Sequence, residues 1–296
     1  MSGLPHNGGM SGPCTSSPAP SESSATSVRQ TAVGLARGMA GGLLLGLPVL
    51  MTMEMWEHGF ALPTWKLLLL YAASFGILLI LEYYSGFQDE ETWLDVVQDA
   101  VIAAGLGLVV AGALLWVFGV LAPGMGTREI VGKIVIESIP VSIGASAAAG
   151  QLGTRSQGGE RRRREAGYWG TLAIALGGAV VFGFNVAPTE EPVLIGLKVT
   201  DFQGLLLLAL SLLQTHAVVY ALNFRGSDPI PEGMSALAVL FRYSVVTLAV
   251  AMLAALFLLW IFGRVGADTG LLPTVHMTMA LTLMTSLGAS AAKLLL

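Results

Sequence analysis

Eight apolar stretches of about twenty residues constrain the fold of this chain more than any other feature. A helix of that length crosses about 30 Å of hydrocarbon, whereas spanning β-strands would show short alternating patterns, which this sequence lacks. Only 11% of the residues are charged, against about 25% in soluble domains. The sequence therefore predicts an all-α membrane protein with about eight transmembrane helices. The predicted spans are residues 32–54, 65–84, 94–121, 130–150, 168–189, 202–222, 235–262 and 273–294.

The N-terminal residues have a different composition. Residues 1–28 are rich in Ser, Pro and Gly and hold too few large apolar side chains to bury a core, which predicts a disordered tail. They lack the basic and apolar segments of a signal peptide, so we expect the first span to direct membrane insertion. The single Cys14 excludes an intramolecular disulfide. After the tail we expect four helices over 29–153, an Arg-rich loop over 154–167 and four helices over 168–296.

The Lys and Arg residues predict the orientation, because cytoplasmic loops carry an excess of them. Ten of the fifteen fall on one side of the predicted spans. We therefore expect a protein of the inner (plasma) membrane with both termini in the cytoplasm. The ten are Arg29, Arg37, Arg155, Arg161 to Arg164, Arg225, Arg242 and Lys293, and the other five are Lys66, Arg128, Lys133, Lys198 and Arg264. The run at 161–164 could bind lipid headgroups or nucleic acid. A loop that sets topology is the favoured interpretation, and the net charge of −4 argues against nucleic acid as a partner.

Short motifs recur at constant spacings, which indicates two parallel four-helix repeats. Two matches are 144 residues apart, one is 138 apart and one is 137 apart. Each half would contain an even number of spans, so both copies would enter the membrane in the same direction. The matches are Trp116 to Gly119 with Trp260 to Gly263, Gly144 to Ala148 with Gly288 to Ala292, Leu67 to Leu70 with Leu205 to Leu208, and Gly46, Thr52 and Glu54 with Gly183, Thr189 and Glu191.

Small residues at four-residue spacing predict close helix packing in each half. Glycines recur at every fourth position from Gly34 to Gly46, which lets another backbone approach closely. Packing within the chain is the favoured use, and dimerisation remains open, so a homo-oligomer is compatible with the sequence. A ridge of small polar residues lies in the last span of each half. It consists of Ser138, Ser142 and Ser146 in the first half and Thr282, Ser286 and Ser290 in the second.

One segment interrupts the apolar pattern with polar groups and two prolines. It reads Asn185-Val186-Ala187-Pro188-Thr189-Glu190-Glu191-Pro192, and Thr52-Met53-Glu54 occupies the corresponding place in the first half. With the Trp-x-Phe-Gly pair, this segment resembles a family of uncharacterised bacterial multi-span integral membrane proteins over about residues 30–295. The resemblance implies a bacterial setting and a helical membrane fold.

The chemistry of this segment suits a cation. Pro188 and Pro192 cannot donate to the preceding helical turn, so carbonyl oxygens are freed near two carboxylates, and hard cations prefer oxygen ligands. If the helix continued, Asn185 and Thr189 would share a face. Glu54, Glu190 and Glu191 could then surround one outer mouth, with Thr52, Asn185 and Thr189 as neutral ligands. Alternatively, these carboxylates only end helices at the water interface.

A few ionisable residues lie within predicted spans. Glu137 is deep in the fourth span, where it either pairs with Lys133 or relays protons or ions. On the cytoplasmic side Asp95 and Asp99 share a helix face and are expected to pair with Arg242. The histidines His216 and His276 are isolated in the sequence and are expected to serve packing. Glu82 and Tyr220 are further ionisable residues near the cytoplasmic ends of the predicted spans.

Two function classes remain after these observations. The first is a cation or proton transporter or channel with an acidic site between the repeats near the outer leaflet. The second is a non-transporting scaffold, sensor or assembly partner, favoured by the scarcity of polar groups at span centres. No nucleophile–base pair, phosphate loop, dinucleotide motif or metal motif occurs, so we expect neither an enzyme nor a cofactor. The expected partners are the lipid bilayer and a small cation.

Overall fold

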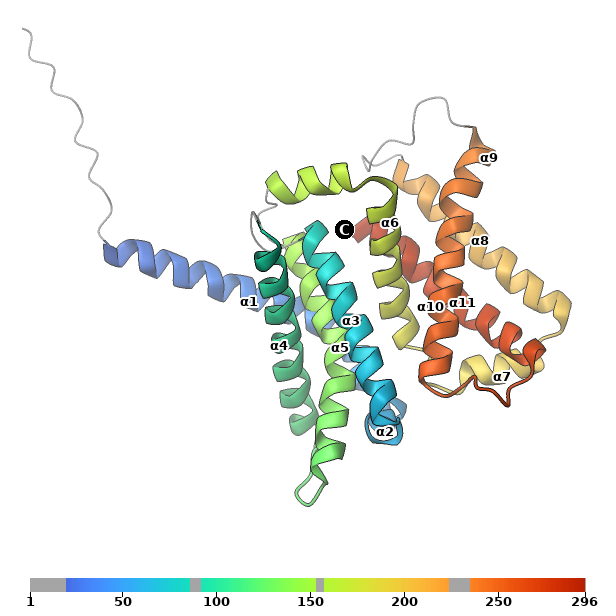
Figure 1. Cartoon of the computed structure of the whole chain (residues 1–296), viewed down its shortest axis with the longest axis horizontal. Coiled ribbons are helices and arrows are strands. Elements are labelled where there is room, and N and C mark those ends of the chain that lie inside the picture. The colour runs from blue at the N-terminus through green and yellow to red at the C-terminus, as the bar shows by residue number, and fades with distance from the viewer. Residues whose placement is uncertain (1–19, 86–91, 153–156, 224–234, 296) are drawn as a thin grey trace, which may run out of the picture. The chain divides into compact units, whose positions relative to one another are not determined.

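The computed structural model describes residues 20–85, 92–152, 157–223 and 235–295, and within them it contains helices and no strands. Residues 34–296 form one compact unit and residues 1–33 another. The helices are α1 (Pro20–Leu50), α2 (Met53–Ala61), α3 (Thr64–Ser85), α4 (Trp93–Val117), α5 (Thr127–Leu152), α6 (Gln157–Phe184), α7 (Glu191–Lys198), α8 (Asp201–Asn223), α9 (Ala236–Val239), η1 (Leu240–Val245), α10 (Val246–Ile261) and α11 (Leu271–Leu295), as drawn in Figure 1.

Seven helices of the described residues are long and apolar enough to cross a membrane. The fifth predicted span corresponds to Tyr168–Phe184, which is helical and apolar but shorter than the other seven. The seven long segments are Ala32–Leu50, Thr64–Tyr83, Trp93–Val117, Thr127–Ala148, Asp201–Val218, Leu237–Ile261 and Leu271–Ala292. The prediction of an all-α protein with several membrane-length helices is therefore confirmed.

α4 ends at Val117 rather than at residue 121, and two other predicted span ends were wrong for a shared physical reason. α1 ends at Leu50 rather than at residue 54, and α6 ends at Phe184 rather than at residue 189. In each break a threonine hydroxyl captures a nearby carbonyl: Thr52 donates to Val49 O and Thr189 to Val186 O, both at 2.7 Å. Such local side-chain bonds compete with helix continuation.

Two segments that were predicted to be non-helical are helical in the structure. α1 begins at Pro20, so residues 20–28 are helical rather than part of a disordered tail. α6 begins at Gln157, so residues 157–167 are helical rather than a loop. The first part of the predicted tail, 1–19, lies outside the described residues.

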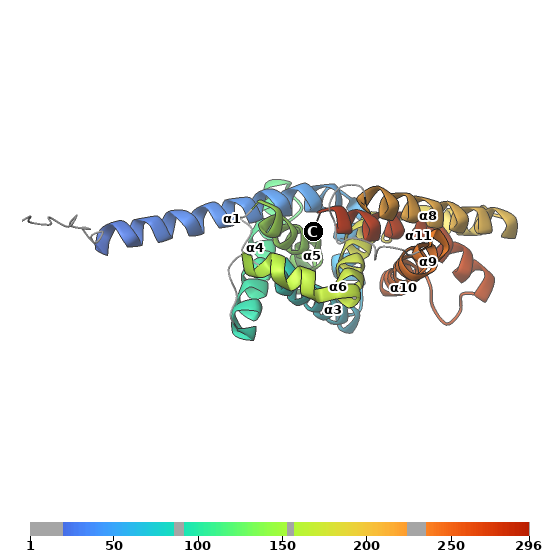
Figure 2. The same ribbon diagram turned by 90° about the horizontal axis from the view of Figure 1, so that it is seen from above.

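Each half packs around its last helix. α5 contacts α2, α3 and α4, and α11 contacts α7, α8 and α10 (Figure 1). The view in Figure 2 shows α8 beside α11. α6 joins the halves because it packs on α3 as well as on α10 and α11.

Large apolar side chains remain exposed on the outer helices, and an aqueous surface would rarely carry so many. Examples are Leu94, Val101 and Val109 on α4 and Phe202, Leu205 and Leu213 on α8. By contrast, α5 is the most buried of the seven long segments. Hydrocarbon is the environment that suits such outer faces.

The Trp-x-Phe-Gly motifs form the same helix-ending turn. Gly119 has φ 72° and Gly263 has φ 73°, a left-handed conformation that glycine adopts without a Cβ penalty. After Gly119, the amide of Val120 donates to Leu115 O at 2.9 Å, and after Gly263 the amide of Arg264 donates to Leu259 O at 2.8 Å. This is the Schellman pattern of helix C-termini.

Glycine contacts also occur in matched pairs. A Cβ on Gly59 would meet the backbone of Lys133, and one on Gly196 would meet the backbone of Met277. Lys133 and Met277 are 144 residues apart. Likewise, Gly41 lies against Gly144, and Gly178 lies against Gly288.

The glycine series of α1 packs within the chain. Gly42 and Gly46 both lie against Val141 of α5, closely enough that a Cβ on either would clash. At these two positions the structure therefore supports intramolecular packing. No atom lies within 4 Å of the Cβ position of Gly34.

Candidate functional site

The turn between α6 and α7 is held by its own side chains. The Asn185 amide donates to Val181 O at 3.0 Å, and the Thr189 hydroxyl donates to Val186 O. α6 ends at Phe184, so the helix does not continue and the condition under which Asn185 and Thr189 would share a helix face is not met. Both groups are used to shape the turn, which leaves Pro188 buried at its centre.

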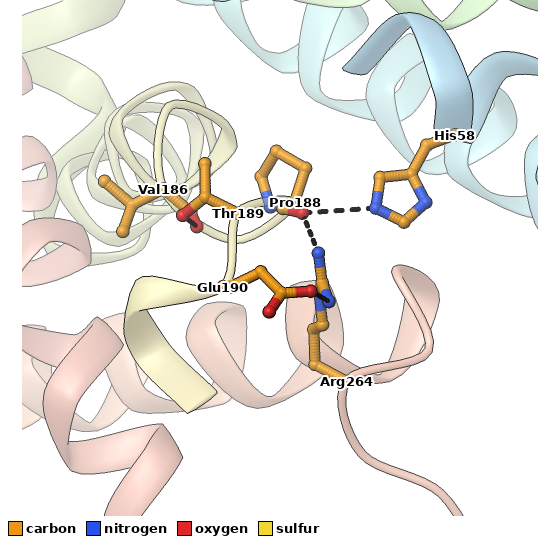
Figure 3. A network of polar contacts seen from close by, with 6 residues as sticks. All are labelled: His58, Val186, Pro188, Thr189, Glu190 and Arg264. Carbon is orange, nitrogen blue, oxygen red and sulfur yellow. Dashed lines mark hydrogen bonds and ion pairs between the residues drawn. The ribbon is translucent and has the colours of Figure 1, made fainter. Parts of the chain in front are cut away.

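The Pro188 carbonyl is the meeting point of three separate chain segments (Figure 3). His58 of α2 approaches it with Nε2 at 3.2 Å, and Arg264, after α10, donates to it through a guanidinium N–H. A carbonyl only accepts, so His58 Nε2 carries the hydrogen. A second guanidinium nitrogen of Arg264 lies 3.3 Å from Glu190 Oε1. The contact joins the first half to the second.

Aromatic packing supports the same junction. The ring of His58 lies 5.1 Å from that of Phe262, and Phe262 packs edge-on against the buried Phe184 at 5.6 Å. Nearby, Lys66 of α3 donates to Trp260 O at 2.6 Å. The two halves are therefore joined by packed rings as well as by polar contacts.

Arg264 owes its position to the turn at Gly263. The left-handed glycine reverses the chain directly after α10, and the next residue is held by its amide bond to Leu259 O. Its side chain is only 18% exposed, whereas that of Glu190 is 73% exposed. Arg264 therefore interacts chiefly with the buried Pro188 carbonyl, and its ion pair with Glu190 is largely solvated.

Burial and charge shift the titration of two groups at this junction. Burial lowers the pKa of His58, and the nearby Arg264 lowers it further. The neutral imidazole is therefore favoured. The Thr189 hydroxyl and the local backbone N–H lower the pKa of Glu191, as does Arg264. The single hydrogen of that hydroxyl is directed to Val186 O, so we assign the effect mainly to the N–H and to Arg264.

Four of the predicted outer ligands, Asn185, Thr189, Glu190 and Glu191, lie in or directly after the turn that follows α6, and the other two lie at the start of α2. Thr52 is the residue before α2, and Glu54 lies in its first turn. Among the described residues, no three His, Cys, Asp or Glu side chains come close enough to hold a metal ion. His58 and Arg264, which the sequence reasoning missed, are the residues that bind the turn. A usable signal was present: Arg264 directly follows the second Trp-x-Phe-Gly motif.

Glu137 lies inside α5. Its side chain is fully buried, and neither carboxyl oxygen has a hydrogen-bond partner among the described residues. The predicted pair with Lys133 was wrong, because Lys133 Nζ binds Glu129 at 2.7 Å instead. Three residues further on, Pro140 lacks the N–H that would bond Ile136 O in a regular helix. Within the described part of the chain, Glu137 is thus a buried acid whose carboxyl oxygens accept no hydrogen bond.

The cytoplasmic-side predictions had mixed outcomes. Asp95 caps α4 by accepting from the Thr92 amide at 3.1 Å. The Arg242 guanidinium lies 5.6 Å from the centre of the Tyr168 ring, in a π-helical turn. Asp95 therefore has a local partner at the start of α4, and Arg242 stacks on a residue of α6 instead of pairing with Asp95.

The histidines are not isolated in the structure. His216 Nδ1 lies 3.0 Å from Ser244 Oγ, and His276 Nε2 lies 3.2 Å from Asp201 Oδ1. Both contacts join different helices, so the expected packing role now includes specific polar partners.

These features together define a class: a polytopic α-helical membrane protein with buried polar groups. The chain belongs to the family described as "Putative integral membrane protein (DUF2391)", which matches residues 34–296. The predicted membership of a multi-span membrane family is confirmed at that level. Comparisons with curated proteins and with solved structures found no match.

Proposed function

We propose that the protein moves protons across a membrane and that Glu137 is the group that binds them. The observation that carries this proposal is the complete burial of Glu137 without a hydrogen-bond partner among the described residues. An ionised carboxylate in such a place costs several kcal/mol, so a structural role alone gives no reason to keep it. By contrast, a carboxyl group that binds and releases a proton at this position has a functional reason to be buried.

A proton fits this position better than a metal cation. Hard cations such as Ca²⁺ take six to eight oxygen ligands in proteins, whereas one carboxyl suffices for a proton. We assign Glu54, Glu190 and Glu191 to an outer approach that raises the local concentration of cations, including protons.

The proposed architecture is two parallel four-helix repeats with eight spans. The matched turns at Gly119 and Gly263 support it, as do the matched contacts of Gly59 and Gly196. In this arrangement Tyr168–Phe184 is the fifth of the eight spans, and its short length is compensated by local thinning of the bilayer. We place the protein in a bacterial inner membrane with both termini in the cytoplasm.

Purified protein in liposomes tests the function. An internal pH-sensitive dye reports proton flux, and separate vesicles carry Na⁺ or K⁺ gradients. We expect a pH gradient to collapse faster than in empty liposomes and the Na⁺ and K⁺ gradients to persist. Replacing Glu54, Glu190 and Glu191 together by Gln should slow the flux by several-fold, and less at high salt.

Two other results would overturn the proposal. Movement of Na⁺ or K⁺ without protons would favour a cation carrier. Absence of any flux would favour a scaffold, sensor or assembly partner, for which the packed junction of His58, Pro188 and Arg264 would be a purely structural joint.

A further inference from the structure

Lys133 of α5 is a buried cation. Its side chain is 7% exposed, and its Nζ lies 2.7 Å from Glu129 Oε1. The backbone of Lys133 packs against Gly59 of α2 so closely that a Cβ on Gly59 would clash with it. The centre of the Phe60 ring, also on α2, lies 5.5 Å from Nζ. The main chain at Lys133 is therefore fixed by packing, and the charged end of its flexible side chain is the part that can move.

Two acids flank Lys133 at equal spacing. Glu129 lies four residues before it and Glu137 four residues after it, so each is one helical turn away along α5. Side chains at this spacing on a helix can form an ion pair. The two acids are two turns apart, about 12 Å along the helix, so a single ammonium group can neutralise either of them but not both together.

The two acids differ in their access to water. The side chain of Glu129 is 31% exposed. Glu137 is fully buried, and its carboxyl oxygens accept no hydrogen bond from the residues that the structure describes. Water can stabilise an ionised Glu129 without the lysine, but it cannot stabilise an ionised Glu137 in this position. The observed pair of Lys133 with Glu129 is therefore the arrangement expected when Glu137 is protonated.

The second half keeps the packing of this region without its charges. Gly196 of α7 packs against the backbone of Met277, as Gly59 of α2 packs against α5. This close contact therefore does not need a lysine, and packing alone gives no reason for the charged residues of α5. These residues have uncharged counterparts 144 positions later: Pro273 for Glu129, Met277 for Lys133 and Leu281 for Glu137.

We propose that Lys133 is an exchangeable counter-ion, which pairs with Glu129 while Glu137 holds a proton and moves to Glu137 when that proton leaves. This inference rests on the proposed proton binding by Glu137. When the O–H bond of Glu137 breaks, the proton passes to water, and Nζ leaves Glu129 for the new carboxylate. Protonation of Glu137 by a hydronium ion returns Lys133 to Glu129. No other covalent bond changes.

The exchange avoids an unpaired buried charge in both states. While Glu137 is protonated, Glu129 balances the positive charge of Lys133. After the proton has left, Glu137 balances it, and Glu129 is stabilised by water. A buried ion without a partner is strongly unfavourable, so a lysine placed between a buried acid and an exposed acid makes release of the proton easier.

Infrared spectroscopy observes the protonated carboxyl of Glu137 directly, because its C=O stretch is absent from a carboxylate. The sample is purified protein in lipid nanodiscs at pH 7, and the band of Glu137 is the carboxyl signal that Glu137→Gln removes. We expect this band in the wild type. Lys133→Met should keep it, because no counter-ion remains for the carboxylate. Glu129→Gln should weaken it at least about twofold, because the released lysine pairs with Glu137.

The two variants are matched to exclude a purely structural role. Both remove the ion pair between Glu129 and Lys133, so loss of that pair alone cannot change the Glu137 band in one variant and preserve it in the other. Glu129→Gln combined with Lys133→Met should keep the band, like Lys133→Met alone. In liposomes, each single variant should lower the proton flux at least about tenfold, because each favours one protonation state of Glu137.

The outcomes separate the exchange from the function. A wild type without a Glu137 band, or an unchanged band in Glu129→Gln, overturns the exchange and leaves the flux assay to decide the function. Absence of proton flux in a wild type with the expected bands overturns transport and leaves the exchange standing. If Lys133→Met fails to fold, the band of Glu129→Gln decides the question, because this substitution changes a side chain that is 31% exposed.

Discussion

The guanidinium of Arg264 donates to the main-chain carbonyl of Pro188, 76 residues earlier in the chain, and His58 of the first half shares the same acceptor. This relationship ties the turn after α6 to the end of α10 and to α2. It makes Arg264 the main polar link at the junction, while the carboxylates around it remain solvated.

Loss of Arg264 should therefore matter more than loss of its ion-pair partner. We expect Arg264→Gln to lower the free energy of unfolding by about 1–3 kcal/mol, because the Pro188 carbonyl loses a charged donor. Glu190→Gln should change it by less than about 1 kcal/mol, since its side chain is 73% exposed. Thermal melting in detergent measures both, and equal destabilisation by the two variants would contradict this hierarchy.

The lowered pKa of His58 predicts a pH dependence of stability. The unfolded imidazole titrates near 6.5, and the folded one at a lower pH, so the unfolded state binds more protons between these values. Stability should be fully present above pH 6.5 and should fall as the pH drops through the folded pKa. Protonation would also place a positive charge beside Arg264.

Melting temperatures of the wild type and His58→Gln isolate this effect. The glutamine amide can still donate to Pro188 O but does not titrate. The wild type should lose more stability than His58→Gln between pH 8 and pH 5. Parallel pH profiles for the two proteins would show that His58 does not contribute.

Close helix packing at Gly178 gives a prediction independent of charge. A methyl group there would clash with Gly288 O and with the Cβ of Ala292, so Gly178→Ala should destabilise by about 1–3 kcal/mol. Gly105, also within a helix, has no atom within 4 Å of its Cβ position. Gly105→Ala should leave the melting temperature unchanged or slightly raised. A comparable loss in both variants would argue against close packing of α6 on α11.

An all-α chain with several membrane-length helices could be predicted from the sequence because hydropathy and length are local properties. The ends at Leu50 and Phe184 could not, since hydropathy continued beyond them while threonine hydroxyls captured backbone carbonyls. The matched Trp-x-Phe-Gly motifs were visible in the sequence, but their left-handed turn and its effect on Arg264 depend on tertiary structure.

The candidate site residues likewise include features that the sequence predicts and features that depend on the tertiary structure. Burial of Glu137 could be anticipated from its place within an apolar run, whereas the choice of Lys133 between Glu129 and Glu137 could not. Both acids are one helical turn from Lys133, and the structure selects Glu129. His58 was overlooked because its partner is a main-chain carbonyl, a group present at every residue.

Proton flux through Glu137→Gln, measured in liposomes against Leu281→Gln, tests proton transport most directly. Both variants place the same amide at corresponding positions of the two halves, so general effects of a buried amide are matched. We predict that Glu137→Gln lowers the initial rate at least about tenfold, while Leu281→Gln, if folded, keeps most of it. Wild-type flux in Glu137→Gln, or no flux in the wild type itself, would contradict a proton-carrying role for this acid.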